Sequence, residues 1–136
     1  MKHVIIFFIL ITWACSTSEK KQEQGSTPEI GAALDAKTFK EKFTSEPNAV
    51  LLDVRTPGEV AEGAIPGAMN IDFSAPDFTE KISALDKEKS YFVYCKGGGR
   101  SSKTADEMKE VGFTKVYNLE GGYDAWVGSG FETTVP

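Results

Sequence analysis

The segment from Tyr91 to Ser102, YFVYCKGGGRSS, constrains the fold of this chain more than any other segment. Its aromatic and β-branched start is typical of a short buried strand, and the three glycines that follow predict a tight loop. A helical pattern then extends from Arg100 to Val111. The order of strand, loop and helix places Cys95 at the carboxyl end of the strand, at the base of the loop.

This loop has the chemistry of an anion-binding cradle. Glycine tolerates positive φ, so the backbone N–H groups of the loop can point inward, and the helix behind it adds the positive end of its dipole. These dipoles and the two neighbouring cations, Lys96 and Arg100, favour the thiolate form of Cys95 over the thiol. We therefore expect Cys95 to be a nucleophile with a charged, exposed sulfur. The residues expected to bind its anionic substrate are Lys96, Gly97, Gly98, Gly99, Arg100 and Ser101.

Several of these residues have a structural alternative. A cysteine that ends a strand can be a small core residue, although the glycines and cations beside Cys95 favour a functional role. Ser101 either caps the following helix or donates its hydroxyl to the sulfur. Asp53 and Arg55 end the neighbouring apolar segment, and we interpret them first as structural, with Arg55 and Glu59 at helical spacing. The alternative is that these three residues support the wall of the site.

Composition excludes several other classes of site. The chain has 136 residues, a formal net charge of −5 and a pI of about 4.9, with no basic stripe that would suit a nucleic acid. Its single histidine is His3, close to the amino terminus. The folded domain therefore has no Cys-His dyad, no Ser-His-Asp triad and no histidine-based metal site. We expect neither a metal nor an organic cofactor.

The amino terminus predicts export. Residues 1–15 have a basic start, a short apolar run and a small residue before Cys15, which is the form of a signal peptide. The Ala-Cys-Ser junction resembles a bacterial lipoprotein signal, in which Cys15 would carry the lipid; ordinary cleavage and an uncleaved anchor are the alternatives. Residues 16–28 are polar apart from a final proline, so we expect a flexible linker. The folded domain is predicted at 29–136, either periplasmic or tethered to a membrane only through this anchor.

Apolar runs and helical patterns alternate along residues 29–136. Such alternation predicts an α/β fold with a parallel sheet covered by helices on both faces. In sheets of this kind, sites form at the carboxyl ends of strands, which is where Cys95 lies. The strands are predicted at 49–54, 68–71, 91–94 and 115–119. The helices are predicted at 35–44, 58–62, 77–85, 100–111 and 121–127.

Four stretches, in this order, resemble a single-domain rhodanese. They are LDVRTPGE at 52–59, GAIPGAMNI at 63–71, the loop at 95–101 and LEGGYDAW at 119–126. The resemblance implies a rhodanese-like fold, a five-stranded parallel sheet flanked by helices on both faces, with the cysteine loop as the active site. One departure is Ala64, where the family often has a histidine of structural role. Its absence should affect local packing more than chemistry.

The resemblance also implies a thiosulfate sulfurtransferase. A sulfur-donor anion such as thiosulfate would pass its sulfane sulfur to Cys95, and cyanide or a thiol would accept it from the persulfide. An exported thiol of this kind would need a redox protein partner or a steady supply of sulfur. One alternative is a persulfide carrier that binds a protein partner. The other is a cysteine-dependent phosphatase or arsenate reductase with Asp72 or Asp77 as the acid, but phosphatases of this fold carry one more residue between cysteine and arginine.

Overall fold

One parallel sheet forms the centre of the domain. The computed structural model describes residues 29–136, so the predicted signal peptide and linker at 1–28 lie outside the described residues. The strands are β1 (Glu29–Leu34), β2 (Ala49–Asp53), β3 (Met69–Asn70), β4 (Ser90–Tyr94) and β5 (Lys115–Leu119). The helices are α1 (Ala36–Ser45), α2 (Pro57–Ala61), α3 (Phe78–Ser83), α4 (Gly99–Glu110) and α5 (Gly122–Gly128). The strand order is β1-β5-β4-β2-β3, and every pair of neighbouring strands is parallel.

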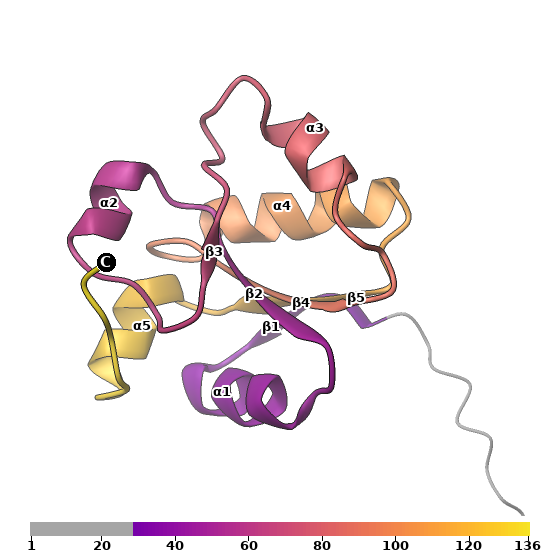
Figure 1. Cartoon of the computed structure of the whole chain (residues 1–136). Coiled ribbons are helices and arrows are strands. Elements are labelled where there is room, and N and C mark those ends of the chain that lie inside the picture. The colour runs from indigo at the N-terminus through magenta and orange to yellow at the C-terminus, as the bar shows by residue number, and fades with distance from the viewer. Residues whose placement is uncertain (1–28) are drawn as a thin grey trace, which may run out of the picture.

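Helices cover both faces of this sheet. In Figure 1, α3 and α4 lie on one side, and α1 and α5 lie on the other. The α/β class, the parallel sheet and its two helical layers are therefore confirmed. The structure adds β1 to the four strands predicted from individual apolar segments. Its ladder with β5 shifts register between Ile30 and Ala32, around Gly31, whose φ is +74°.

The central strand β4 divides the core into two clusters. All five of its residues are buried, because neighbours on both sides and helices on both faces exclude water. Tyr91 and Val93 face the cluster beneath α3 and α4, and Cys95 continues that alternation just beyond the strand. Phe92 and Tyr94 face the cluster beneath α1 and α5. The alternation thus directs the cysteine toward α4.

Cys95 also lies where the direction of chain crossover reverses. The chain passes from β2 outward to the edge strand β3, whereas from β4 it passes to β5 in the opposite direction. The loops after β2 and β4 therefore separate and leave a crevice at the carboxyl ends of these strands. This is the left-hand end of the sheet in Figure 1, where α2 and the start of α4 meet. The topology alone makes this edge the favoured place for a site.

Four of the five helices described within residues 29–136 begin in one of two ways. Asp35 caps α1 through its carboxylate, which accepts two backbone N–H groups at 3.0 and 3.1 Å. Thr56 and Glu59 form a reciprocal capping box at the start of α2. At the starts of α4 and α5 the cap residues are Gly98 and Gly121, both left-handed and without a side-chain bond. The two helices that begin beside the cysteine loop thus rely on glycine.

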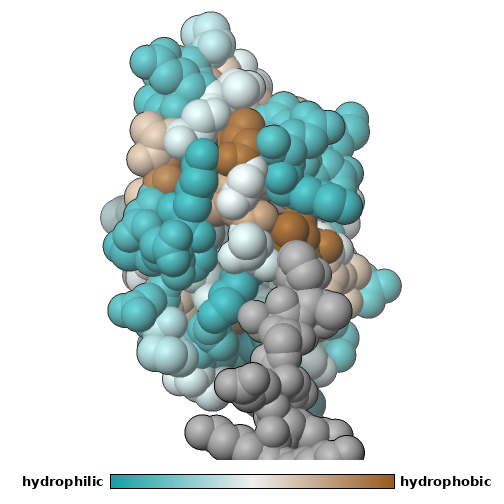
Figure 2. All heavy atoms as spheres, turned by 90° about the vertical axis from the view of Figure 1, so that its right-hand side faces the viewer, coloured by the Kyte–Doolittle hydropathy of each residue, from teal (hydrophilic) through white to brown (hydrophobic). Residues whose placement is uncertain are grey.

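The opposite end of the domain is mainly hydrophilic. Figure 2 views the molecule from the right-hand side of Figure 1 and shows hydrophobic residues only in small separate areas of that face. Among residues 29–136, no helix is both long enough and apolar enough to cross a bilayer.

Phe92 provides a test of the core. It is 0% exposed and contacts the rings of Phe39, Phe43 and Tyr117 at centroid distances of 5.3, 5.5 and 4.8 Å. Phe92→Ala should lower the free energy of unfolding in urea by about 3–5 kcal/mol, because a large buried ring leaves a cavity. Val135→Ala, at a side chain that is 73% exposed, should change it by less than about 0.5 kcal/mol. Equal effects of the two substitutions would contradict this account of the core.

Candidate functional site

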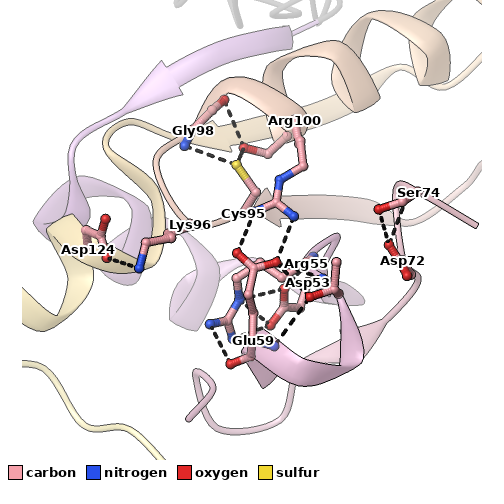
Figure 3. Close-up of polar contacts among 12 residues, drawn as sticks. Asp53, Arg55, Glu59, Asp72, Ser74, Cys95, Lys96, Gly98, Arg100 and Asp124 are labelled. Carbon is pink, nitrogen blue, oxygen red and sulfur yellow. Dashed lines mark hydrogen bonds and ion pairs between the residues drawn. The ribbon is translucent and has the colours of Figure 1, made fainter. Parts of the chain in front are cut away.

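The Cys95 sulfur lies inside the loop and is surrounded by hydrogen-bond donors. The backbone N–H of Gly98 donates to Sγ at 3.1 Å. The Ser101 hydroxyl lies 3.4 Å from Sγ and 3.1 Å from the Gly98 carbonyl oxygen. Figure 3 shows the sulfur between Gly98 and Arg100. The predicted inward-facing N–H group is therefore present, and the geometry of Ser101 suits either of its predicted roles, the cap or the sulfur contact.

The expected exposure of the sulfur is wrong: Cys95 is buried and only 2% exposed. Burial by itself raises the pKa of this thiol because it disfavours the charged form. The Ser101 hydroxyl and the backbone N–H groups of residues 98, 100 and 101 lower that pKa, and together they outweigh burial. The pKa of Cys95 therefore lies below its usual value. The cradle stabilises the thiolate through short-range donors, although the sulfur is covered.

The first turn of α5 holds the outer side of the loop. The N–H of Tyr123 donates to the Cys95 carbonyl at 2.8 Å, and the N–H of Asp124 donates to the Lys96 carbonyl at 3.1 Å. These bonds satisfy the two carbonyls on the side away from the sulfur. The approach requires glycine: a Cβ on Gly122, where φ is +60°, would lie 2.5 Å from the Cys95 oxygen and 2.4 Å from that of Lys96. Gly122 thus sets how closely α5 packs on the loop.

Each of the two cations of the loop has a carboxylate partner. Arg100 donates through both terminal nitrogens to the Glu59 carboxylate, at 2.8 and 2.7 Å. Lys96 pairs with Asp124 at 3.7 Å. The expected Arg55–Glu59 side-chain pair is wrong, because Arg55 reaches only the backbone oxygen of Glu59, at 3.3 Å. The bond to Arg100 lowers the pKa of Glu59 to about 2, so this carboxylate stays ionised at neutral pH.

Asp53 and Arg55 form a buried ion pair behind the site. Two guanidinium nitrogens donate to the Asp53 carboxylate, and the shortest contact is 2.6 Å. The same guanidinium donates to the Gly63 oxygen at 2.8 Å and lies 4.2 Å from the centroid of the Tyr123 ring. Burial lowers the pKa of Arg55, but Asp53 more than offsets this and raises it. The pair joins β2 to the loop after α2 and to α5, so its geometry suits both predicted roles, the structural pair and the support of the site wall.

An open cleft of about 220 Å³ lies beside the loop. Its wall includes the ion-paired residues Lys96, Asp124 and Glu59, and also Glu62 and the exposed side chain of Val127. This cleft lies on the side of the loop that faces α5. Neither Cys95 nor Arg100 lines it, so the cleft adjoins the sulfur cradle without enclosing the sulfur, and its wall carries charges of both signs.

The structure brings most of the predicted site residues together and adds several. Cys95, Gly98 and Arg100 form one cluster, with Glu59 and the Asp53–Arg55 pair adjoining it (Figure 3). Ser101 belongs to the same cluster through its contact with the sulfur. Gly122 and Asp124 were not among the site residues predicted from sequence, although the Gly-Gly-Tyr-Asp run after an apolar strand was a usable signal. Asp72, one of the two candidate phosphatase acids, instead accepts bonds from Ser74, apart from the sulfur in Figure 3.

The other candidate acid, Asp77, pairs with Lys81 at 2.9 Å. Both carboxylates predicted as candidate phosphatase acids thus make local contacts. Within residues 29–136, no group of three or more His, Cys, Asp or Glu side chains is placed to hold a metal ion.

Comparisons with known proteins agree with this geometry. Residues 35–129 match the family described as the rhodanese-like domain. The Bacillus subtilis protein YtwF, provisionally named a sulfurtransferase, is 41% identical over 95 residues, which cover 70% of this chain and 89% of the relative. Thiosulfate sulfurtransferase 16 of Arabidopsis thaliana is 37% identical and covers 60% of this chain and 77% of its own. The crystal structure of a rhodanese-related protein from Thermoplasma volcanium superposes with a TM-score of 0.68 at 28% identity, covering 77% and 99% of the two chains.

Gly122→Ala should raise the pKa of Cys95. The added Cβ and the left-handed backbone together force the loop away from α5, at a cost of about 1–3 kcal/mol in stability, and disturb the N–H groups that face the sulfur. The pH dependence of alkylation by iodoacetamide, followed by mass spectrometry on the peptide that carries Cys95, should shift to higher pH.

Gly128→Ala is the matched control, because that glycine lies in the same helix with open space around it. Far-ultraviolet circular dichroism would confirm that both variants fold. A folded Gly122→Ala protein with the alkylation profile of the wild type would show that α5 does not hold the cradle.

Proposed function

This chain belongs to the rhodanese-like family, and we propose that it is a sulfurtransferase that carries sulfane sulfur as a persulfide on Cys95. Relatives that match it are named sulfurtransferases. Thiosulfate or a related sulfane compound would be the donor, and a thiol or cyanide would be the acceptor. The observation that carries the proposal is the position of the Cys95 sulfur at the end of the central strand, within reach of the Gly98 N–H and the Ser101 hydroxyl; these donors act in the direction of a lowered pKa for Cys95.

The reaction divides into two displacements. The Cys95 thiolate attacks the outer sulfur of thiosulfate; the new S–S bond forms as the donor's own S–S bond breaks, and sulfite leaves with the bonding electron pair. The acceptor then attacks the outer sulfur of the persulfide, and the Cys95 thiolate leaves. Sulfur is transferred with no net change in the oxidation state of the enzyme.

Neither displacement needs a histidine base. The folded domain has none, since the only histidine of the chain is His3. A nucleophile that is already ionised has no proton to lose, so the role of the protein is to stabilise the anion in advance. Donors from residues 98 and 101 supply that stabilisation at 3.1 and 3.4 Å from Sγ. The arrangement therefore suits sulfur transfer better than chemistry that depends on general acid or base groups.

Phosphate-ester hydrolysis has less support. It requires an acid for the leaving alkoxide, whereas Asp72 and Asp77 are held in contacts with Ser74 and Lys81.

A persulfide carrier for a protein partner uses the same loop as the enzyme and differs only in its turnover of small donors. An assay with thiosulfate and cyanide separates carrier from enzyme.

Mass spectrometry after exposure to thiosulfate tests the persulfide directly. We expect a gain equal to one sulfur atom on the peptide that contains Cys95, and its loss on treatment with cyanide. Cys95→Ser should show no gain, because a serine hydroxyl is not ionised at neutral pH, whereas Cys15→Ser should behave as the wild type. Turnover of an aryl phosphate without a persulfide would reverse the assignment.

We also infer that the domain is exported and tethered through a lipid on Cys15, with residues 1–15 as the signal and 16–28 as the linker. Support comes from the basic start, the apolar run and the Ala-Cys-Ser junction. Cells given a fatty-acid analogue should label the wild-type protein and not Cys15→Ala. Equal labelling of the two proteins would exclude the lipid anchor. In that compartment a redox protein partner would keep Cys95 reduced.

A further inference from the structure

The charge around the sulfur is balanced rather than positive. The Arg100 guanidinium, on α4, donates through two nitrogens to the carboxylate of Glu59, on α2. The two side chains are 29% and 26% exposed, so solvent screens this pair only in part. A bidentate contact of this kind neutralises the cation and occupies the fork that would otherwise accept an oxyanion.

Glu59 is held in place independently of Arg100. One of its oxygens accepts the backbone N–H and the hydroxyl of Thr56, each at 3.0 Å. The Glu59 backbone N–H donates in return to the Thr56 hydroxyl at 3.4 Å. The capping box thus orients the carboxylate toward Arg100, and moving it aside would also break the start of α2. A donor anion that binds the Arg100 guanidinium would have to compete with the Glu59 carboxylate, which already accepts hydrogen bonds from both of its terminal nitrogens.

The second cation is balanced as well, though more loosely. Lys96 lies 3.7 Å from the Asp124 carboxylate, and both side chains are more than 60% exposed. An exposed pair of this kind contributes little to stability, but it still places a negative charge beside the positive one. Together, two cations and two carboxylates surround the mouth of the loop with no net charge. The thiolate itself and the short-range N–H donors then dominate the field at the sulfur.

We propose that Glu59 determines the charge class of the sulfur donor, disfavouring dianions and favouring singly charged organic donors such as a persulfide of a small thiol. This proposal rests on the proposed sulfurtransferase function and names the donor of the same site. A dianion gains about twice the Coulomb energy of a monoanion from an uncompensated cation. Pairing of Arg100 with Glu59 therefore weakens the electrostatic attraction of thiosulfate to the site more than it weakens that of a monoanion.

The reaction with such a donor balances without any further reagent. The Cys95 thiolate attacks the outer sulfur of a persulfide anion, RSS⁻; the Cys95 S–S bond forms, the donor's S–S bond breaks, and the thiolate RS⁻ leaves with the electron pair. No electron or proton need be supplied. The leaving group carries one negative charge, compared with two on sulfite.

Two donors that transfer the same sulfur test the proposal. Thiosulfate is a dianion, and methanethiosulfonate, CH₃SO₂S⁻, is a monoanion that loses sulfinate instead of sulfite. Glu59→Gln should raise the ratio of kcat/KM for thiosulfate to kcat/KM for methanethiosulfonate about fivefold or more, because Arg100 regains a net charge. Glutamine can replace glutamate in the capping box, so α2 should remain intact.

The ratio is the appropriate readout because it cancels effects common to both donors. Freeing Arg100 would also stabilise the Cys95 thiolate and so change the rate with either donor. Glu62→Gln is the matched control: it removes the same charge from the same cleft, and no ion pair involving Glu62 is formed within residues 29–136. This variant should leave the ratio within about twofold of the wild type.

The outcomes separate this inference from the proposed function. If neither donor loads sulfur onto Cys95 in the wild type, the sulfurtransferase assignment itself fails. If both donors load it, but Glu59→Gln leaves the ratio unchanged or Glu62→Gln shifts it equally, then Glu59 has no specific role in selecting the donor. Thermal unfolding followed by circular dichroism would confirm that both variants are folded in the assay.

Discussion

The packing of α5 against the cysteine loop is the contact on which the rest of the site depends. Two N–H groups of its first turn bind the carbonyls of Cys95 and Lys96, and the absence of a side chain at Gly122 allows the backbones to approach. Carbonyls bound on one side leave N–H groups free to face the sulfur on the other. The cradle is therefore a property of two segments, and the helix that stabilises it begins 27 residues after the cysteine.

Two ion pairs, Asp53–Arg55 and Glu59–Arg100, connect the buried interior of the domain with the surroundings of the cysteine loop. The buried Asp53–Arg55 pair joins β2 to the loop after α2 and to α5, which fixes the position of α2 relative to the site. Glu59 on α2 then reaches Arg100. The five-residue helix α2 thus places the Glu59 carboxylate beside Arg100, because the buried Asp53–Arg55 pair fixes the position of α2. In the proposed sulfur transfer, short-range donors would stabilise the covered thiolate, and the ion pair of Glu59 with Arg100 would select the sulfur donor.

Local sequence predicted the elements that have strong patterns of their own. The aromatic strand at 91–94, the glycine loop and the helix at 35–44 could be predicted because each depends on neighbours in sequence. Strand β1 was not, since Glu29–Leu34 contains few strong strand formers and its extended state comes from pairing with β5. The partner of Glu59 was mistaken for the same reason: helical spacing suggested Arg55, but Arg100, 41 residues away in sequence, has the better geometry.

By itself, the sequence determined that this is a parallel α/β domain with one thiol at the end of its central strand, a three-glycine loop and no histidine base. Those properties depend on residue type and on short spacings along the chain, which are the same whatever tertiary contacts form. Only the tertiary structure decided that the sulfur is covered, that α5 holds its loop and that both loop cations are neutralised. The physical reason is that burial and ion pairing depend on distances in space, and these join α2, α4 and α5 only after the sheet has formed.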